Sequence, residues 1–310
     1  MKETAQTVGR MCPVDPDCNP EEGRVRWDPT KSLWYSAHVL LGIVGMASGF
    51  SWPAFFVCGL LTVVTLCAGH TVGLHRLLIH RSFQAPRWLE HLLVYLGTLV
   101  GMGGPFSMLY LHDIRDWSQR HPRCHRFYIH QASFWKDWIY NLHCRFELTH
   151  PPVFEIEPSV RENRFYQFLE KTWMGQQIVL AVPLYLLGGL PWVLLGISGR
   201  IALSLTGHWL IGYFAHNRGA RRWILEGHSI QGYNLPGLGL LTMGEGWHNN
   251  HHAFPESARL GHRGQSDPGW WLIRFLEWMG LAHNVQSPEI LPPRPERKRI
   301  QIGTADSPTA

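Results

Sequence analysis

The chain has 310 residues, and 28 Lys and Arg against 23 Asp and Glu give it a formal net charge of +5 at pH 7. The basic residues form no compact stripe with interleaved aromatics, which argues against nucleic-acid binding. The charge suits a protein whose cytoplasmic surface faces anionic lipid headgroups. The apolar residues are bunched into a few long runs, as in membrane proteins, while a mean hydropathy near zero predicts a large water-facing part as well.

The two ends of the chain are polar and rich in proline. Residues 1–32 contain Pro13, Pro16 and Pro20, so no signal peptide is expected, and we predict a disordered or loosely attached cytoplasmic tail. Residues 288–310 are charged and proline-rich, which predicts a second disordered tail. One membrane domain, residues 33–287, remains between them. The cysteines form no CxxC pair, so neither a disulfide framework nor a cysteine metal site is indicated.

Four apolar runs of spanning length predict transmembrane helices. They are Leu33 to Phe50, Trp52 to about Gly73, Ile178 to Gly196, and Ile201 to Ala215. A short uncharged turn joins the first pair, and residues 197–200 join the second, which is interrupted by Pro183 and Pro191. The predicted fold class is an all-α membrane protein with four transmembrane helices in two hairpins.

Basic residues flank these runs unequally, which predicts the orientation in the membrane. Arg200 is the single basic residue of the turns at one end, whereas the other end carries Lys31, Arg76, Arg81, Arg87 and the cluster Arg294, Arg297, Lys298 and Arg299. The positive-inside rule places both termini in the cytoplasm.

Residues 88–111 are apolar but carry His91 and a Gly-rich break at residues 101–105. A crossing here would put the histidines before and after the segment on opposite sides of the membrane. Ligands of one ion must lie within about 2 Å of it, so a shared metal site forbids that arrangement. We predict a membrane-skimming or re-entrant segment, with an ordinary span as the alternative.

The rest of the chain predicts a cytoplasmic cap. Residues 111–177 are mixed, aromatic and charged, as expected of short helices. Pro268 to Val285 is rich in tryptophan and predicts an amphipathic helix at the membrane interface, or core packing of the cap as an equally good alternative.

Histidines are concentrated in the stretch Gly244 to Pro255, behind a Gly-Glu-Gly lead. Neutral imidazole is the commonest side-chain ligand for iron, zinc and copper. On a helical path His248 and His252 lie four residues apart and share a face, and His251 lies on the same side. The pattern therefore favours a metal site in the cap over a polar loop that carries histidines.

Two further histidine motifs lie at the ends of predicted spans. His75 and His80 follow directly on the second run, and His216 stands near the end of the last. Ionisable residues at such positions are candidate functional groups, although a single histidine is often a structural core residue.

Together these motifs resemble the membrane-bound fatty acyl desaturases of the acyl-CoA desaturase type. The resemblance rests on HRLLIHRSF, on the Ala-His at 215–216 and on GEGWHNNHHAFP, and it covers roughly residues 30–285. It implies two non-haem irons on the cytoplasmic side of four spans, above a tunnel for a long acyl chain. Its iron ligands would be His75, His80, His216, His248, His251 and His252.

The second histidine box departs from the family pattern of Arg-Asp-His-x-x-His-His. Read from Arg115-Asp116, this chain has Trp117 and Arg120 at two ligand positions and keeps only His121. Indole cannot coordinate iron, and a guanidinium about 5 Å from the metal would repel it by several kcal/mol. Arg120 must point away, or that iron is displaced. The expected replacement ligands are His121 and, after it, His125 and His112.

The resemblance also implies roles near the metal. Asp116 and Glu245 are candidates to orient ligand imidazoles, which metal-bound histidines usually require. The family has a neutral side chain, acting through water, one turn before the His216 equivalent. Gly212 stands there in this chain, so an open coordination position is expected.

The implied reaction is an O2-dependent removal of two hydrogens from adjacent methylenes of an acyl chain, carried by coenzyme A, a carrier protein or a lipid. No haem, flavin or clustered-cysteine motif is present, so electrons would come from a separate ferredoxin or haem protein with its reductase. A diiron hydroxylase is one alternative. A non-catalytic membrane protein that lost one iron is another.

Overall fold

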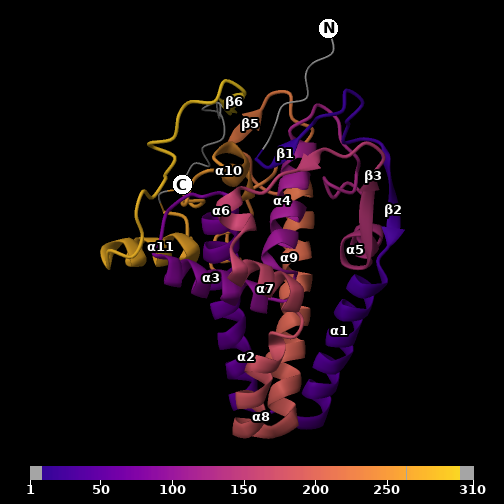
Figure 1. Ribbon diagram of the computed structural model, residues 1–310, viewed down its shortest axis with the longest axis vertical. Helices are drawn as coiled ribbons and strands as arrows, with labels where there is room; N and C mark the ends of the chain where they lie inside the picture. The colour runs from indigo at the N-terminus through magenta and orange to yellow at the C-terminus, as the bar shows by residue number, and fades with distance from the viewer. Residues whose placement is uncertain (1–8, 263, 301–310) are drawn as a thin grey trace, which may run out of the picture.

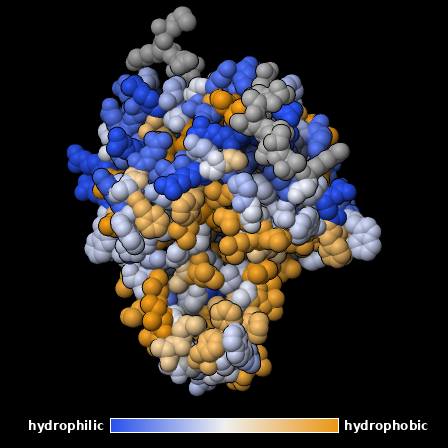
Figure 2. All heavy atoms as spheres, turned by 180° about the vertical axis from the view of Figure 1, so that it is seen from behind, coloured by the Kyte–Doolittle hydropathy of each residue, from blue (hydrophilic) through white to orange (hydrophobic). Residues whose placement is uncertain are grey.

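The computed structural model describes residues 9–262 and 264–300 of the chain. In Figure 1, long helices run downward from a cap that contains the short helices, the loops and the two-stranded sheets. The upper half of the surface in Figure 2 is largely hydrophilic and the lower half largely hydrophobic. The chain thus divides into a part suited to water and a part suited to lipid.

The first hairpin joins α1 (Pro29–Gly49) to α2 (Trp52–Val64), which continues into the π-helix η1 (Thr65–Ile79). The side chains of Asp28 and Ser51 accept hydrogen bonds from backbone N–H groups in the first turns of α1 and α2. Such caps satisfy donors that a helix start leaves free. The first two predicted runs are therefore helical, and they are separated at the expected turn.

The second hairpin turns at Gly189, and the predicted turn at residues 197–200 is wrong. Gly189 lies inside α8 (Gln177–Val193) at φ 67° and ψ −162°, a region that is essentially limited to glycine. The chain reverses there, and Leu184 packs against Gly196. The hydropathy pattern did not indicate a turn at Gly189, because the residues on both sides of it are equally apolar.

Because the turn lies at Gly189, Arg200 is a buried helical residue and not a surface residue of a turn. The π-helix η2 (Leu194–Gly199) runs directly into α9 (Arg200–Asn217), so Arg200 lies within a continuous helix. Its buried guanidinium donates to the backbone oxygen of Leu99 and to Oε1 of Gln177. The far turns of the two hairpins therefore carry no basic residue, which strengthens the charge asymmetry of the sequence.

Within residues 9–262 and 264–300, two helical stretches are long and apolar enough to cross a membrane. One is Trp52–Ile79, with 28 residues, and the other is Gln177–Asn217, the 41-residue stretch of the second hairpin. Only 33% and 11% of their most apolar windows are buried within the protein, so most of their apolar side chains face outward. A core helix of a soluble protein would be buried, so this mostly helical protein is suited to membrane association.

Residues 88–111 form two helices rather than one continuous span. α3 (Arg87–Leu99) has 13 residues, about 20 Å, which is shorter than the hydrocarbon core of a bilayer. It packs closely on η1, because a Cβ at Gly69 would lie 2.3 Å from the backbone of Leu96. The glycine-rich break follows, and α4 (Pro105–Gln119) then rises into the cap.

The described part of the N-terminal tail is ordered against the cap, contrary to the prediction. β1 (Met11–Cys12) pairs with β4 (Val153–Phe154), and β2 (Gly23–Trp27) pairs with β3 (Cys144–Leu148). Met11 has no exposed surface. The proline content suggested disorder, and the strands that pair with this segment lie more than a hundred residues away in the sequence.

The C-terminal segment is also ordered as far as residue 300. β6 (Arg297–Arg299) pairs with β5 (Trp223–Leu225) beside α10 (His248–Ala253), which carries the third histidine motif. α11 (Pro268–Trp278) lies across the base of the cap with Trp271 and Trp278 exposed. The remaining cap helices are α5 (Phe134–His143), α6 (Pro158–Arg161) and α7 (Arg164–Thr172).

Candidate metal centre

The π-helical form of η1 aligns the histidines of the first box. Residues five apart in an α-helix point about 140° away from each other. In η1 the backbone bonds span five residues, as between His80 N and His75 O at 3.1 Å, and such widened turns often occur at functional sites. His75 and His80 therefore lie on one face, with ring centroids 4.8 Å apart.

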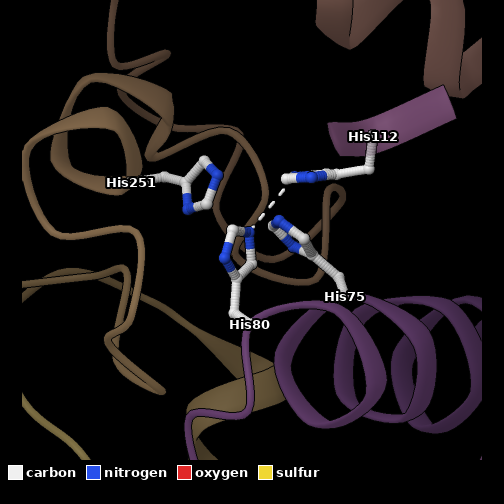
Figure 3. Close-up of side chains that lie close together, drawn as sticks. All are labelled: His75, His80, His112 and His251. Carbon is white, nitrogen blue, oxygen red and sulfur yellow. Dashed lines mark hydrogen bonds between the residues drawn. The ribbon is translucent and has the colours of Figure 1, made fainter. Parts of the chain in front are cut away.

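Four histidines from three parts of the chain form the first group. They are His75, His80, His112 and His251, and one ring nitrogen of each lies within 4.8 Å of one ring nitrogen of every other. Figure 3 shows the four rings turned toward a common point, with Nε2 of His80 and Nε2 of His112 3.1 Å apart. Cis ligands at about 2.1 Å from one ion are about 3 Å apart, so this spacing suits a metal.

Three histidines form a second group beside the first. Nε2 of His248 lies 3.1 Å from Nε2 of His216 and 3.0 Å from Nε2 of His252. α9 brings His216, and the two others come from one face of α10, as their spacing predicted. The ring centroids of His248 and His251 are 6.0 Å apart, so α10 contributes to both groups.

The structure places the second histidine box five residues earlier than the predicted alignment. His112, on α4, lies in the first group, whereas His121 and His125 lie outside both groups. His121 packs on the ring of Trp117, and its Nδ1 lies 2.8 Å from the Trp117 backbone oxygen. His125 stacks on Phe146 at the surface of the cap. Trp117 itself is a buried core residue and not a failed ligand.

The shifted register explains the charged residues of this box. In the spacing His-x-x-His-His counted from His112, the second and third positions are Arg115 and Asp116. Arg120 pairs with Asp116, with Nη2 2.8 Å from Oδ2. The guanidinium of Arg120 is therefore held by the carboxylate of Asp116. Burial would raise the pKa of Asp116, but Arg120 lowers it below the usual value, so the carboxylate stays ionised.

His130 fills the space that Gly212 leaves beside the second group. Its Nε2 lies 2.9 Å from where a Cβ on Gly212 would stand, and its ring stacks on His216 at 5.1 Å. Nδ1–H of His130 donates to Asp137, 2.9 Å away, and Nε2 accepts from Arg115 at 2.7 Å. The expected open position is thus lined by an oriented imidazole. His130 lies on a loop, so no helical spacing in the sequence links it to the other histidines.

Glu245, which was predicted to orient a ligand imidazole, lies beside a histidine of the first group. Its Oε2 lies 2.8 Å from Nδ1 of His75, which leaves Nε2 free to coordinate. Burial would raise the pKa of Glu245, but His75 and Arg76 lower it to about 2. Arg76 also binds Asp267, with Nη2 2.8 Å from Oδ1. This buried network links the first box to the loop that precedes α11.

Four of the seven imidazoles take the form that binds metal. Burial lowers the pKa of His80, His248 and His251 well below its ordinary value, and it lowers that of His252 to about 4. These rings are neutral at pH 7. Nδ1 of His251 is buried without a hydrogen-bond partner, as a nitrogen that awaits a ligand would be. All-imidazole donor sets of this kind suit iron.

Both ends of the described chain hold the histidine motifs in place. Arg10 donates to the backbone oxygens of Leu78 and Ile79 at the end of η1, and it pairs with Asp113 beside His112 at 3.0 Å. Arg294 and Arg297 donate to backbone oxygens at the end of α10. These cations satisfy carbonyl groups that a helix end leaves free. Residues outside the predicted domain, 33–287, thus contact the histidine motifs.

The fold and these groups define a class of protein: a membrane-associated helical protein with two neighbouring histidine groups suited to metal. The profile of the fatty acid desaturase family matches residues 50–262, more than half of the chain. The expected resemblance is confirmed by relatives of known function.

Three such relatives are similar over most of their length. An sn-1 stearoyl-lipid 9-desaturase of Synechocystis sp. is 33% identical over 275 residues, which cover 87% of this chain and 84% of that protein. The corresponding enzyme of Anabaena variabilis is 38% identical over 245 residues, covering 77% and 86%. An acyl-CoA C20 Delta5-desaturase of Anemone leveillei is 33% identical over 250 residues, covering 78% and 76%. The chain belongs to the fatty acid desaturase family and is an oxidoreductase that desaturates fatty acyl chains.

Proposed function

We propose that the protein is an O2-dependent desaturase that introduces a double bond into an acyl chain through two non-haem irons. His75, His80, His112 and His251 would hold one iron, and His216, His248 and His252 the other. The observation that carries this proposal is the convergence of seven imidazoles from four helical segments into two groups. His121 and His125 are no longer proposed as ligands.

Four transmembrane helices are proposed to hold this centre on the cytoplasmic side. α1 with α2 and α8 with α9 would be the two hairpins, and the far turns carry no charge, since residues 32–75 and 172–199 contain no Asp, Glu, Lys or Arg. The basic residues at the cap end favour the cytoplasm for the cap and both termini. Because Arg10 and Arg297 support the site, we propose that the desaturase domain extends beyond residues 33–287.

Iron, when bound, would supply the oxidising power that unactivated C–H bonds require. The chain's own residues would prepare the site. Glu245 holds the tautomer of His75, and Asp137 holds that of His130. Arg120 stays paired with Asp116, so the negative carboxylate balances the positive guanidinium near the neutral imidazoles.

The acyl carrier and the electron donor are proposed from the relatives and the sequence. The cyanobacterial relatives are named for lipid-bound chains and the Anemone enzyme for acyl-CoA. We favour a membrane lipid as the carrier, because the apolar surface lies directly below the cap. A ferredoxin or a haem protein with its reductase would deliver the electrons.

Lipid profiling tests this function. Expression in a host without a desaturase is expected to yield a new unsaturated acyl chain, and the His251→Ala variant is expected to yield less than about 1% as much, because it removes a ligand of the first group. Mass spectrometry of the extracted lipids measures both the product and the position of the double bond. A hydroxylated product in place of an alkene, or equal product from His251→Ala, would overturn the proposal.

A further inference from the structure

Two histidines that belong to neither metal group lie deeper in the apolar helices. His70 is on η1 and His208 is on α9, and their ring centroids are 5.0 Å apart. The five-residue spacing of the π-helix continues from His80 and His75 to His70, whose ring lies 6.4 Å from that of His75. The pair thus extends a line of imidazoles from the first metal group toward the membrane.

His208 is exposed on a face of α9 that is otherwise buried. Ile201, Ser204 and Ala215 lie on the same face of α9 as His208, and they are 0%, 1% and 0% exposed. His208 is nevertheless exposed, and a Cβ added at the neighbouring Gly207 would meet nothing within 4 Å. The buried face of α9 therefore opens at His208, opposite His70.

Both imidazoles lack a hydrogen-bond partner among residues 9–262 and 264–300, although each is in ring contact with the other. His70 is buried, and a polar side chain that leaves water without gaining a partner lowers the stability of the fold. Plain hydrocarbon in the opening would leave this cost in place. An oxygen atom between the rings would remove it, because neutral imidazole both donates and accepts.

We propose that His70 and His208 form a polar contact in the acyl passage that hydrogen-bonds a hydroxyl or carbonyl oxygen carried by the acyl chain. The inference rests on the proposed function and deepens it, since it makes the enzyme selective for oxygen-bearing chains. The same hydrogen bonds could come from a trapped water molecule, and the experiment separates the two sources.

Lipid binding by the purified full-length protein tests the proposal. The probes are phosphatidylcholine with a stearoyl chain and the same lipid with hydroxystearoyl chains, the hydroxyl moved along the chain. One hydroxyl position is expected to bind about tenfold or more tightly than the plain chain. His208→Leu and His70→Leu are expected to lose this preference, and His208→Gln, which keeps a donor, to retain part of it. His150→Leu, on a half-exposed side chain of the cap, is the matched control.

Each outcome decides the proposal. Equal binding of all the probes by the wild type contradicts it and indicates water in the opening. A preference that survives both leucine variants, or an equal loss of all binding in them, also overturns it. A preference that depends on His70 and His208 supports it even if the lipid-profiling host yields no alkene, a result that would count against the proposed function alone.

Discussion

Replacing His112 by alanine is expected to abolish desaturation, whereas replacing His121 is expected to leave it nearly intact. His112 lies in the first metal group, with Nε2 3.1 Å from that of His80. Loss of a residue that only orients a metal ligand lowers metal affinity or activity by about 10- to 100-fold. Loss of a ligand itself is therefore expected to lower the amount of product by at least about 100-fold. Lipid profiling and iron analysis of the purified variants measure the effect.

His121→Ala is the matched control, because it lies on the same stretch of the chain and packs on Trp117 away from both groups. Iron per chain is expected to fall in the His112 variant and to stay at the wild-type value in the His121 variant. If iron per chain instead falls in the His121 variant and not in the His112 variant, the second box would follow the alignment from Arg115-Asp116. That result would refute the alignment from His112 that the structure indicates.

Replacing Asp267 by alanine is expected to destabilise the cap by about 3–5 kcal/mol, the cost of leaving a buried charge without its partner. Arg76 and Asp267 are each 1% exposed. Asp267 also accepts backbone hydrogen bonds from Leu260, Gly261 and Trp270. Its loss would therefore free the segment between α10 and α11 and release Arg76, which lies next to His75.

Thermal unfolding of the detergent-purified variants measures this effect. Asp267→Asn keeps one of the two acceptor oxygens but not the charge, and it is expected to fall between the wild type and the alanine variant. Glu277→Ala breaks the more exposed pair with Arg274 on α11 and is expected to change the stability by less than about 1 kcal/mol. An Asp267→Ala variant as stable as Glu277→Ala would show that the buried network does not support the cap.

Local patterns were enough to predict the helical runs and to identify the third histidine motif. His248 and His252 share a face because four residues make about one α-helical turn. The same rule would have separated His75 from His80, and only the π-helical winding of η1 unites them. A π-helix has no reliable sequence signal, so the line from His80 to His70 could not be predicted.

The wrong predictions concern contacts between distant parts of the chain. The second box was aligned on Arg115-Asp116 instead of on the spacing that begins at His112, because the sequence alone does not show which histidine faces the others. The N-terminal tail was predicted to be disordered or loosely attached, but Arg10 pairs with Asp113 in the cap. The turn at Gly189 was missed because a glycine in an apolar run signals flexibility without fixing a reversal.

The iron content of the purified protein tests the central claim most directly. With seven imidazoles in two groups, we expect about two irons per chain in the wild type and about one in the His216→Ala variant, whose first group is complete. Elemental analysis, together with protein quantification, gives this ratio without relying on turnover. A wild-type chain that binds no iron, or only one, under reducing conditions with excess ferrous iron would contradict the two-iron account.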